Sequence, residues 1–359
     1  MTALEVYIHQ GKSQLVNQDA MTAYSDWPTP TVIISDGAYG LGVGDWDTKT
    51  ANKLAEWYRP HILQWTARAI PETTLWLWNT EIGWATIHPV LKENGWIYRG
   101  CNIWNKGKGH MAGNVNSKTI RKFPIVTEVC AQYTRSGIQT LGGDAVDLRD
   151  WLRDEWKRSG LKFSAANTAC GVKNAATRKY LTGDDAWYFP PPPQFDALVA
   201  YANLHGLGDG KPYFSTDGIV PLRGSQWVKQ RAKFICPFGV SNVWDEPSVR
   251  GLERLKINGK MLHPNQKPIA LIKMLIECSS NCGDVVWEPF AGTAPALVAC
   301  LRSERLGYGA EINSIYFDAA QKRISSNTKK EEAYPVGRTR SLNELFETPC
   351  GNDVSVKAG

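Results

Sequence analysis

The segment from Gly283 to Tyr316 most constrains how this chain can fold, because it encodes two strands joined by a turn and a helix. Residues 285–287 form a short apolar run without helical periodicity, which predicts a strand buried on both faces. Gly292 allows the sharp turn that must follow this strand, and Pro295 suits the first turn of a helix. The segment therefore predicts a buried parallel sheet.

A second strand is predicted over residues 306–310, and Glu311 follows it directly, 19 residues after Gly292 (311 − 292 = 19). Nucleotide-binding units place the carboxylate that holds a ribose at about this distance from their glycine turn. An ordinary buried strand followed by a surface glutamate gives the same pattern. The G-x-G-x-x-G fingerprint of dinucleotide binding is absent, since Gly292 is followed by Thr-Ala-Pro-Ala.

Another buried strand is predicted over residues 31–34, and it also runs into an acid and a glycine, Asp36 and Gly37. Ligands bind beyond the carboxyl ends of the strands in an open parallel sheet, so this turn and the one at Gly292 can share a cleft. A plain Asp-Gly turn is the alternative. Asp19, about a dozen residues upstream of this strand, is an ordinary turn residue or helix cap by its own pattern.

A further motif, His263-Pro-Asn-Gln-Lys-Pro, precedes a helical run over residues 269–278 and a Gly-Asp pair at 283–284. In this order the segments resemble the DNA amino-methyltransferases, which methylate an exocyclic amine of adenine or cytosine. The family pattern is approximately H-P-x-Q-K-P, a helix, G-D, a strand, D-P-F-x-G-x-G and later G-x-E. This chain has HPNQKP, GD, EPFAGTA and GAE.

The resemblance implies S-adenosylmethionine as the cofactor. It assigns cofactor binding to a set of residues in these motifs: Glu288, Phe290, Gly292, Thr293, Glu311, Asn265, Gln266, Lys267 and Pro268. Asp19 resembles a family position near the same cleft. Two positions depart from the pattern, since Glu288 replaces the usual aspartate and Ala294 replaces the second glycine. Alanine disfavours positive φ, so we expect Ala294 to keep an ordinary backbone conformation.

The resemblance also assigns catalysis to the tetrapeptide Asp36, Gly37, Ala38 and Tyr39, where the family most often has D-P-P-Y, S-P-P-Y or N-P-P-Y. A base amine is a poor nucleophile, because its lone pair is delocalised into the ring. A carboxylate and a backbone carbonyl that accept its N–H bonds favour attack on a methyl donor, and an aromatic ring stacks on the flipped base. Without the prolines, surrounding packing must hold the loop. Within the family, aspartate at the first position is more common with adenine-N6 transfer, so the resemblance slightly favours adenine-N6 over cytosine-N4 transfer.

Basic and polar residues dominate the segment from Asn105 to Lys122. Between Gly95 and Arg135 there are seven lysines and arginines but one acid, Glu128. We expect Lys106 and Lys108 to contact DNA phosphates, although a solvated loop fits the composition equally well.

A helical module is predicted in the middle of the chain. Residues 147–159 form an amphipathic helix, and two shorter helices over 163–170 and 174–181 flank Gly171. This matches a helix-turn-helix, although other helical hairpins share the pattern. The second short helix would present four candidate DNA-binding residues: Lys173, Asn174, Arg178 and Lys179.

The expected fold is α/β, a Rossmann-like S-adenosylmethionine-dependent methyltransferase fold with a doubly wound sheet and a helical target-recognition insertion. We expect the catalytic half at 1–135, the helical module at 136–205, the cofactor half at 206–325 and a flexible tail at 326–359. A net charge of +6 is compatible with double-stranded DNA as partner. A cognate restriction endonuclease is a further expected functional partner.

Eight cysteines without a C-x-x-C pair indicate a reducing cytoplasm and no metal site. The sequence contains no long apolar span, so no membrane segment is predicted. Two other functions remain open. One is a DNA-binding protein that has lost catalysis, and the other is a methyltransferase that acts on RNA or on a protein amide.

Overall fold

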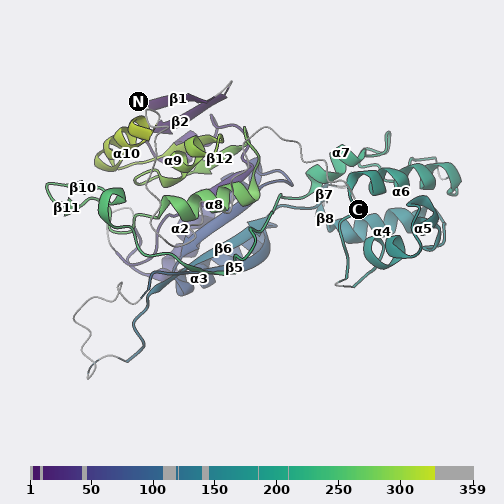
Figure 1. Cartoon of the computed structure of the whole chain (residues 1–359), viewed down its shortest axis with the longest axis horizontal. Coiled ribbons are helices and arrows are strands. Elements are labelled where there is room, and N and C mark those ends of the chain that lie inside the picture. The colour runs from purple at the N-terminus through teal and green to yellow at the C-terminus, as the bar shows by residue number, and fades with distance from the viewer. Residues whose placement is uncertain are drawn as a thin grey trace. The chain divides into compact units, whose positions relative to one another are not determined.

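The computed structural model describes residues 3–8, 11–42, 47–107, 119, 121–139, 145–184, 186–208 and 210–327. The chain forms two compact units (Figure 1). The first combines Met1–Thr134 with Lys233–Gly359, and the second is Arg135–Ala232.

Nine strands of the described residues form one mixed sheet in the first unit. In spatial order these are β1 (Ala3–Ile8), β2 (Gly11–Val16), β13 (Leu306–Ala310), β12 (Val285–Glu288), β3 (Val32–Ser35), β4 (Thr74–Asn79), β6 (Thr127–Thr134), β5 (Ile97–Asn105) and β9 (Val243–Asp245). Strands β2, β13, β12, β3 and β4 are parallel to one another, and β6 is antiparallel to both β4 and β5. The carboxyl ends of the five parallel strands and the start of β6 therefore lie at one edge of the sheet.

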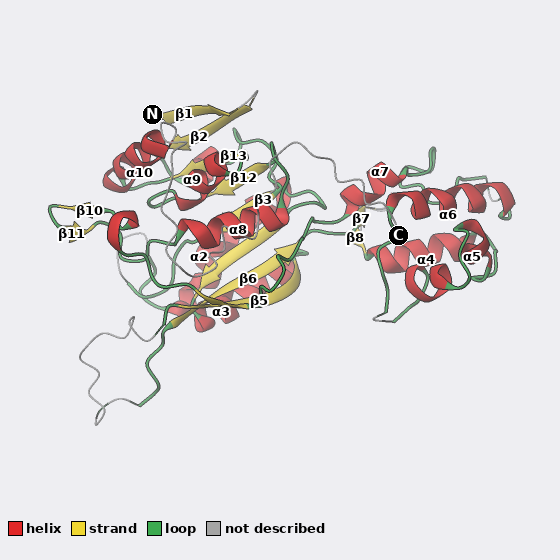
Figure 2. Cartoon of the chain, in the orientation of Figure 1, coloured by secondary structure: helices red, strands yellow, loops and turns green. Residues whose placement is uncertain are grey.

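Helices cover both faces of this sheet (Figure 2). One face packs against α8 (Ile269–Ser279), α9 (Pro295–Arg302) and α10 (Ser314–Asn327), and the other against α1 (Ala20–Ala23), α2 (Leu54–Arg68) and α3 (Glu81–Glu93). Successive side chains of a strand point to opposite faces, so Val32 and Ile34 join the first core while Ile33 joins the second. Both faces are buried, which confirms the predicted doubly wound, Rossmann-like methyltransferase fold.

Three details of this unit are additional to the sequence-based expectations. Strand β2 starts at Gly11 and pairs with both β1 and β13. A small ribbon of β10 (Lys256–Ile257) and β11 (Lys260–Met261) precedes α8. Helix α10 continues to Asn327, so residues 326 and 327 of the expected tail are helical, and residues 328–359 lie outside the described part.

The second unit contains α4 (Leu148–Arg158), α5 (Ala165–Ala169), α6 (Pro192–His205), α7 (Gly224–Trp227) and the ribbon of β7 (Ile138–Gln139) and β8 (Ala145–Val146). It continues to Ala232, beyond the expected boundary at residue 205. The reason is aromatic packing, since Trp227 stacks on Phe195 with ring centroids 4.6 Å apart and on Phe189 at 4.5 Å. Residues 206–232 therefore belong with the helices rather than with the cofactor half.

Two short helical segments flank Gly171, whose φ of 64° is left-handed. The second is a single π-helical turn, Ala176–Tyr180, and is shorter than the predicted helix over 174–181. The four candidate DNA-binding residues of this segment, Lys173, Asn174, Arg178 and Lys179, are all exposed. Among the described helices of both units, none is long and apolar enough to span a membrane.

Candidate active site

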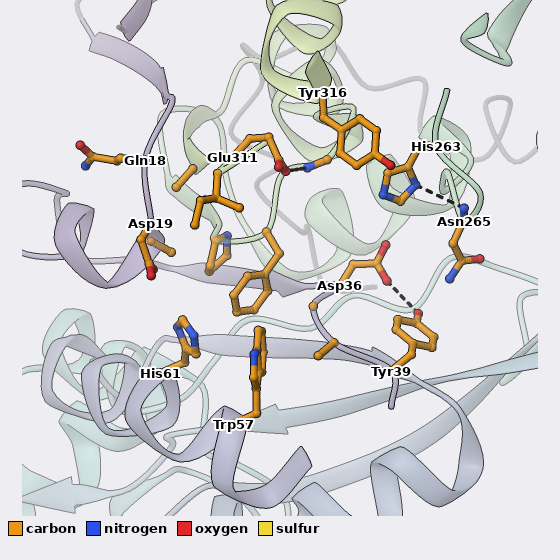
Figure 3. A pocket seen from close by; sticks show the side chains of 18 residues that line it. Gln18, Asp19, Asp36, Tyr39, Trp57, His61, His263, Asn265, Glu311 and Tyr316 are labelled. Carbon is orange, nitrogen blue, oxygen red and sulfur yellow. Dashed lines mark hydrogen bonds between the residues drawn. The ribbon is translucent and has the colours of Figure 1, made fainter. Parts of the chain in front are cut away.

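A pocket of about 240 Å³ opens at the carboxyl edge of the sheet (Figure 3). It lies beyond the ends of β2, β3, β12 and β13, as expected for a ligand site in an open parallel sheet. Eight predicted site residues line it: Asp36, Gly37, Ala38, Tyr39, Asn265, Phe290, Gly292 and Glu311.

The loop that carries Asp36 begins directly after β3 and is held by contacts from other elements. The carbonyl oxygen of Ala38 accepts hydrogen bonds from Asn79 Nδ2 at 2.8 Å and from Tyr58 Oη at 3.2 Å. The Asp47 carboxylate accepts three backbone N–H bonds, from Tyr39 at 2.8 Å, Gly40 at 2.7 Å and Leu41 at 2.9 Å. These side chains supply the rigidity that prolines would give.

The Asp36 carboxylate is bonded within its own loop and to a distant lysine. Its Oδ1 accepts from Tyr39 Oη at 2.7 Å, as Figure 3 shows, and from Lys267 Nζ at 2.7 Å. Burial raises the pKa of Asp36, although the Lys267 ammonium opposes this. Lys267, an expected cofactor ligand, thus bonds to the expected catalytic aspartate and does not line the pocket.

Glu311 links the end of β13 to the glycine turn after β12. Its carboxylate accepts the Gly292 N–H at 2.6 Å and the Asn313 N–H at 2.7 Å, and Gly292 has a left-handed φ of 53°. Burial raises the pKa of Glu311 to about 7, while the two N–H bonds act in the opposite direction. A carboxylate therefore lines the pocket at the position where the sequence predicts one.

Glu288 is buried beneath the turn and does not line the pocket. Its two carboxylate oxygens accept hydrogen bonds from the backbone N–H groups of Ala296 at 2.8 Å and Leu297 at 2.9 Å. These N–H groups lie in the first turn of α9 and have no acceptor within the helix itself. Burial raises its pKa to about 8. The residue caps a helix in place of the direct cofactor contact expected from the sequence, because its longer side chain reaches the helix start.

Ala294 adopts φ 53° and ψ 50°, contrary to the expectation of an ordinary backbone conformation. The tight turn requires a left-handed residue here whichever side chain is present. Such a conformation costs a residue with a Cβ about 1 to 2 kcal/mol. The helix cap from Glu288 helps to hold the turn in this conformation.

Three other expected cofactor ligands have structural contacts away from the pocket. Thr293 is buried and bonds to Arg323, with its hydroxyl 3.2 Å from Nη1. The Gln266 amide bonds to the backbone of Glu253 and Leu255, and Pro268 precedes the first turn of α8.

An aromatic wall completes the pocket, and two of its members, Trp57 and His61, were not predicted from the sequence. The Phe290 ring packs against His61 and Trp57, with centroids 4.9 Å and 5.1 Å apart. Burial lowers the pKa of His61 to about 4, so the imidazole is neutral at pH 7. Asp19 caps α1 by accepting the Met21 N–H at 2.9 Å, and it also lines the pocket.

The expected phosphate contact does not fit the position of Lys106. This lysine is 8% exposed and its ammonium pairs with Glu128, so it faces a carboxylate inside the protein. Burial strengthens the attraction between the Lys106 ammonium and the Glu128 carboxylate, so this ion pair is favoured over a contact with an exposed DNA phosphate. Lys108 lies outside the described residues.

The family model described as DNA methylase matches residues 31–322. The chain belongs to the DNA methylase family. The matched range includes both the loop at Asp36 and the turn at Gly292, so the family assignment covers the whole pocket except the segment at Asp19.

Two curated relatives match part of this DNA methylase. The chain is 40% identical over 104 residues to the DNA adenine methyltransferase YhdJ of Escherichia coli (strain K12), which is 28% of this chain and 34% of the relative. It is 33% identical over 107 residues to the Type II methyltransferase M.HpaI of Haemophilus parainfluenzae, which is 30% of this chain and 33% of the relative. The chain thus spans about a third of the length of each.

Solved structures resemble the chain more distantly. The M1.HpyAVI-SAM complex shares 17% identity with a TM-score of 0.46, covering 86% of this chain and 98% of that chain. The cytosine-N4-specific PvuII DNA methyltransferase shares 11% identity with a TM-score of 0.48, covering 88% and 90%. Similarity at this level carries no argument about activity.

Proposed function

We propose that this protein transfers a methyl group from S-adenosylmethionine to an exocyclic amine of a base in double-stranded DNA. Adenine N6 is the favoured target, and cytosine N4 is the alternative. The observation that carries the proposal is that Asp36 and Glu311, at the ends of two different strands, line one pocket. In a DNA methylase, such a pocket can hold a nucleoside-like cofactor beside an acceptor for a base amine.

The residues present fit the cofactor. S-adenosylmethionine supplies an electrophilic methyl group on a sulfonium sulfur when it is bound. Glu311 can accept hydrogen bonds from ribose hydroxyl groups, Phe290 and Trp57 offer aromatic surface to the adenine ring, and Asp19 can accept from its amine. Asn265, in the segment that precedes α8, adds a polar side chain to the lining of the pocket.

Asp36 would accept an N–H bond from the target amine and keep the nitrogen lone pair available for attack. The Ala38 carbonyl is already engaged by Asn79 and Tyr58, so the second acceptor in the proposal is the Gly37 carbonyl. The Tyr39 ring would stack on the flipped base. Exposed Arg178 and Asn174 of the helical unit are candidates for reading base edges.

A restriction endonuclease as functional partner belongs to the same proposal. It is supported by the partial similarity to a protein named a Type II methyltransferase.

Incubation of the protein with methyl-labelled S-adenosylmethionine tests the proposed reaction. We expect label in duplex DNA from the wild-type protein and none from Asp36→Ala. Preferential labelling of RNA or of protein would contradict the choice of substrate.

A further inference from the structure

Four charged side chains form a cluster at the candidate active-site loop: Asp36, which is 19% exposed and lines the pocket, and the buried Glu128, Lys106 and Lys267. The Lys267 side chain has 0% exposure, and its Nζ is 2.7 Å from Asp36 Oδ1 and 3.2 Å from Glu128 Oε2. The Glu128 Oε1 atom pairs with Lys106, whose side chain is 8% exposed. Two cations and two anions thus balance within one cluster, as buried charges require.

The Lys267 ammonium already has partners for all its donors. It contacts Asp36, Glu128 and the Tyr39 hydroxyl, the last at 3.0 Å, and an ammonium group has three N–H bonds. Lys267 does not line the pocket. A direct bond to the cofactor would therefore cost one of these buried contacts.

We infer that Lys267 is a positioning residue for Asp36: its ammonium holds the Asp36 carboxylate as an anion in one orientation. This inference rests on the proposed methyl transfer, in which Asp36 accepts an N–H bond from the base amine. Lys267 and Tyr39 both bond to Oδ1, so the amine is accepted at Oδ2.

Glu128 moderates this effect because it shares the same ammonium. Burial raises the pKa of Asp36, the Lys267 ammonium lowers it, and the Glu128 carboxylate raises it again. Although burial also acts to raise the pKa of Glu128, the ammonium groups of Lys267 and Lys106 hold it below its usual range. Glu128 is thus the better-compensated carboxylate, and Asp36 depends on Lys267.

Several ionisable groups face this cluster from the surrounding elements. Those that interact with Asp36 are Lys267, Glu128, Tyr39, Tyr58, Cys130 and Glu288. Burial raises the pKa of both tyrosines and of Cys130 well above neutrality, so they stay uncharged near pH 7. Among these six groups Lys267 lowers the pKa of Asp36 most, and the hydrogen bond from the neutral Tyr39 hydroxyl acts in the same direction.

The test compares the pH dependence of single-turnover methyl transfer to duplex DNA in full-length variants saturated with S-adenosylmethionine. In Lys267→Gln we expect the acidic limb of the profile to move to higher pH and the rate at pH 7 to fall by about 100-fold, the scale of a lost electrostatic group. In Lys267→Arg, which keeps the charge, the limb should stay near its wild-type position. In Glu128→Gln it should move to lower pH, because a competing anion is lost.

The matched control is Lys273→Gln on α8, which removes a lysine paired with Glu277 at 3.0 Å and should leave the profile unchanged. The affinity for S-adenosylmethionine should stay within about threefold of wild type in Lys267→Gln, which is below the loss expected for a charged hydrogen bond. A loss of cofactor affinity that accounts for the whole fall in rate would make Lys267 a cofactor ligand and overturn the inference. An unmoved pH profile would also overturn it.

A second measurement separates this inference from the proposed function. Carbon-13 NMR of labelled aspartate, assigned with Asp36→Asn, follows the Asp36 carboxyl without any reaction. We expect it to titrate at higher pH in Lys267→Gln and at lower pH in Glu128→Gln. Unchanged titration would contradict the inference even in an active enzyme, whereas the expected shifts in a protein that methylates no DNA would contradict only the proposed function.

Discussion

The ring of Phe290 packs against the backbone of Gly37: a Cβ atom at that position would lie 2.8 Å from two of its ring carbons. The same Cβ would lie 2.8 Å from Tyr58 Oη. Glycine at this position is therefore matched to the aromatic side chains around it, and a proline could not be restored here without displacing them.

Gly37→Ala should lower the free energy of unfolding by about 1 to 3 kcal/mol, the usual cost of overpacking a filled site. Gly100→Ala is the control, because a Cβ there meets no atom within 4 Å. Urea unfolding of both variants measures the difference. Equal stability of the two would show that the Phe290 ring yields freely.

Ala294→Gly should stabilise the protein. Relief of the left-handed conformation gains about 1 to 2 kcal/mol, and the greater freedom of glycine in the unfolded chain offsets about 0.4 to 1 kcal/mol of this. A net gain of roughly 0.5 to 1 kcal/mol should appear as a raised urea midpoint with an unchanged slope. A lower midpoint would mean that the buried methyl group contributes more than its backbone conformation costs.

The sequence predicts the elements that local patterns determine. Apolar runs mark the strands that precede Asp36 and Gly292, and parallel strands bring their carboxyl ends together, so the prediction that these two turns share a cleft is confirmed. Trp57 and His61 were missed because helical periodicity does not tell which turn of α2 faces a pocket.

Other features depend on contacts that no local pattern contains. Glu128 and Lys267 are 139 residues apart (267 − 128 = 139), and only the assembled sheet brings them together. Glu128 was noticeable as the one acid in a basic stretch, which is the signal that could have indicated a buried pairing. Ala294 shows the opposite case, in which the turn geometry overrides the backbone preference of the residue.

The affinity for S-adenosylmethionine should rise between about pH 6 and pH 8. Burial raises the pKa of Glu311 to about 7, so the carboxyl loses its charge below that pH and becomes a weaker acceptor. By the same shift, Glu311 contributes folding stability at acidic pH that is lost as the pH rises through 7. Calorimetric titration across this range is the measurement.

Glu311→Ala should weaken cofactor binding by about 1.5 to 3 kcal/mol, and Glu311→Gln should remove the pH dependence. Glu93→Gln, at an exposed ion pair with Arg59, serves as the control. Unchanged affinity for S-adenosylmethionine in a folded Glu311→Ala protein would contradict the proposal that Glu311 binds the ribose.

Arg178→Ala should relax sequence preference at one base pair, with a loss of about 1 to 3 kcal/mol at the preferred base. Lys229→Ala provides a control with the same loss of charge, because Lys229 is exposed and lies in the same unit but outside the Gly171 segment. Lys106→Met should leave the salt dependence of DNA binding unchanged, because Lys106 is buried against Glu128. Binding to randomised duplexes at several salt concentrations measures both the sequence preference and the salt dependence. If Arg178→Ala bound these duplexes like wild type, the helical unit would have a purely structural role.

The most direct test of the account is nucleoside analysis of duplex DNA incubated with the protein and S-adenosylmethionine, in parallel with Asp36→Ala. The aspartate acts mainly in the transition state, so its loss should leave cofactor affinity largely intact while methyl transfer falls by orders of magnitude. We predict N6-methyladenine from the wild-type protein and no methylated base from Asp36→Ala. N4-methylcytosine alone would contradict the adenine assignment, and no methylated base from cofactor-bound wild-type protein would contradict the proposed enzyme.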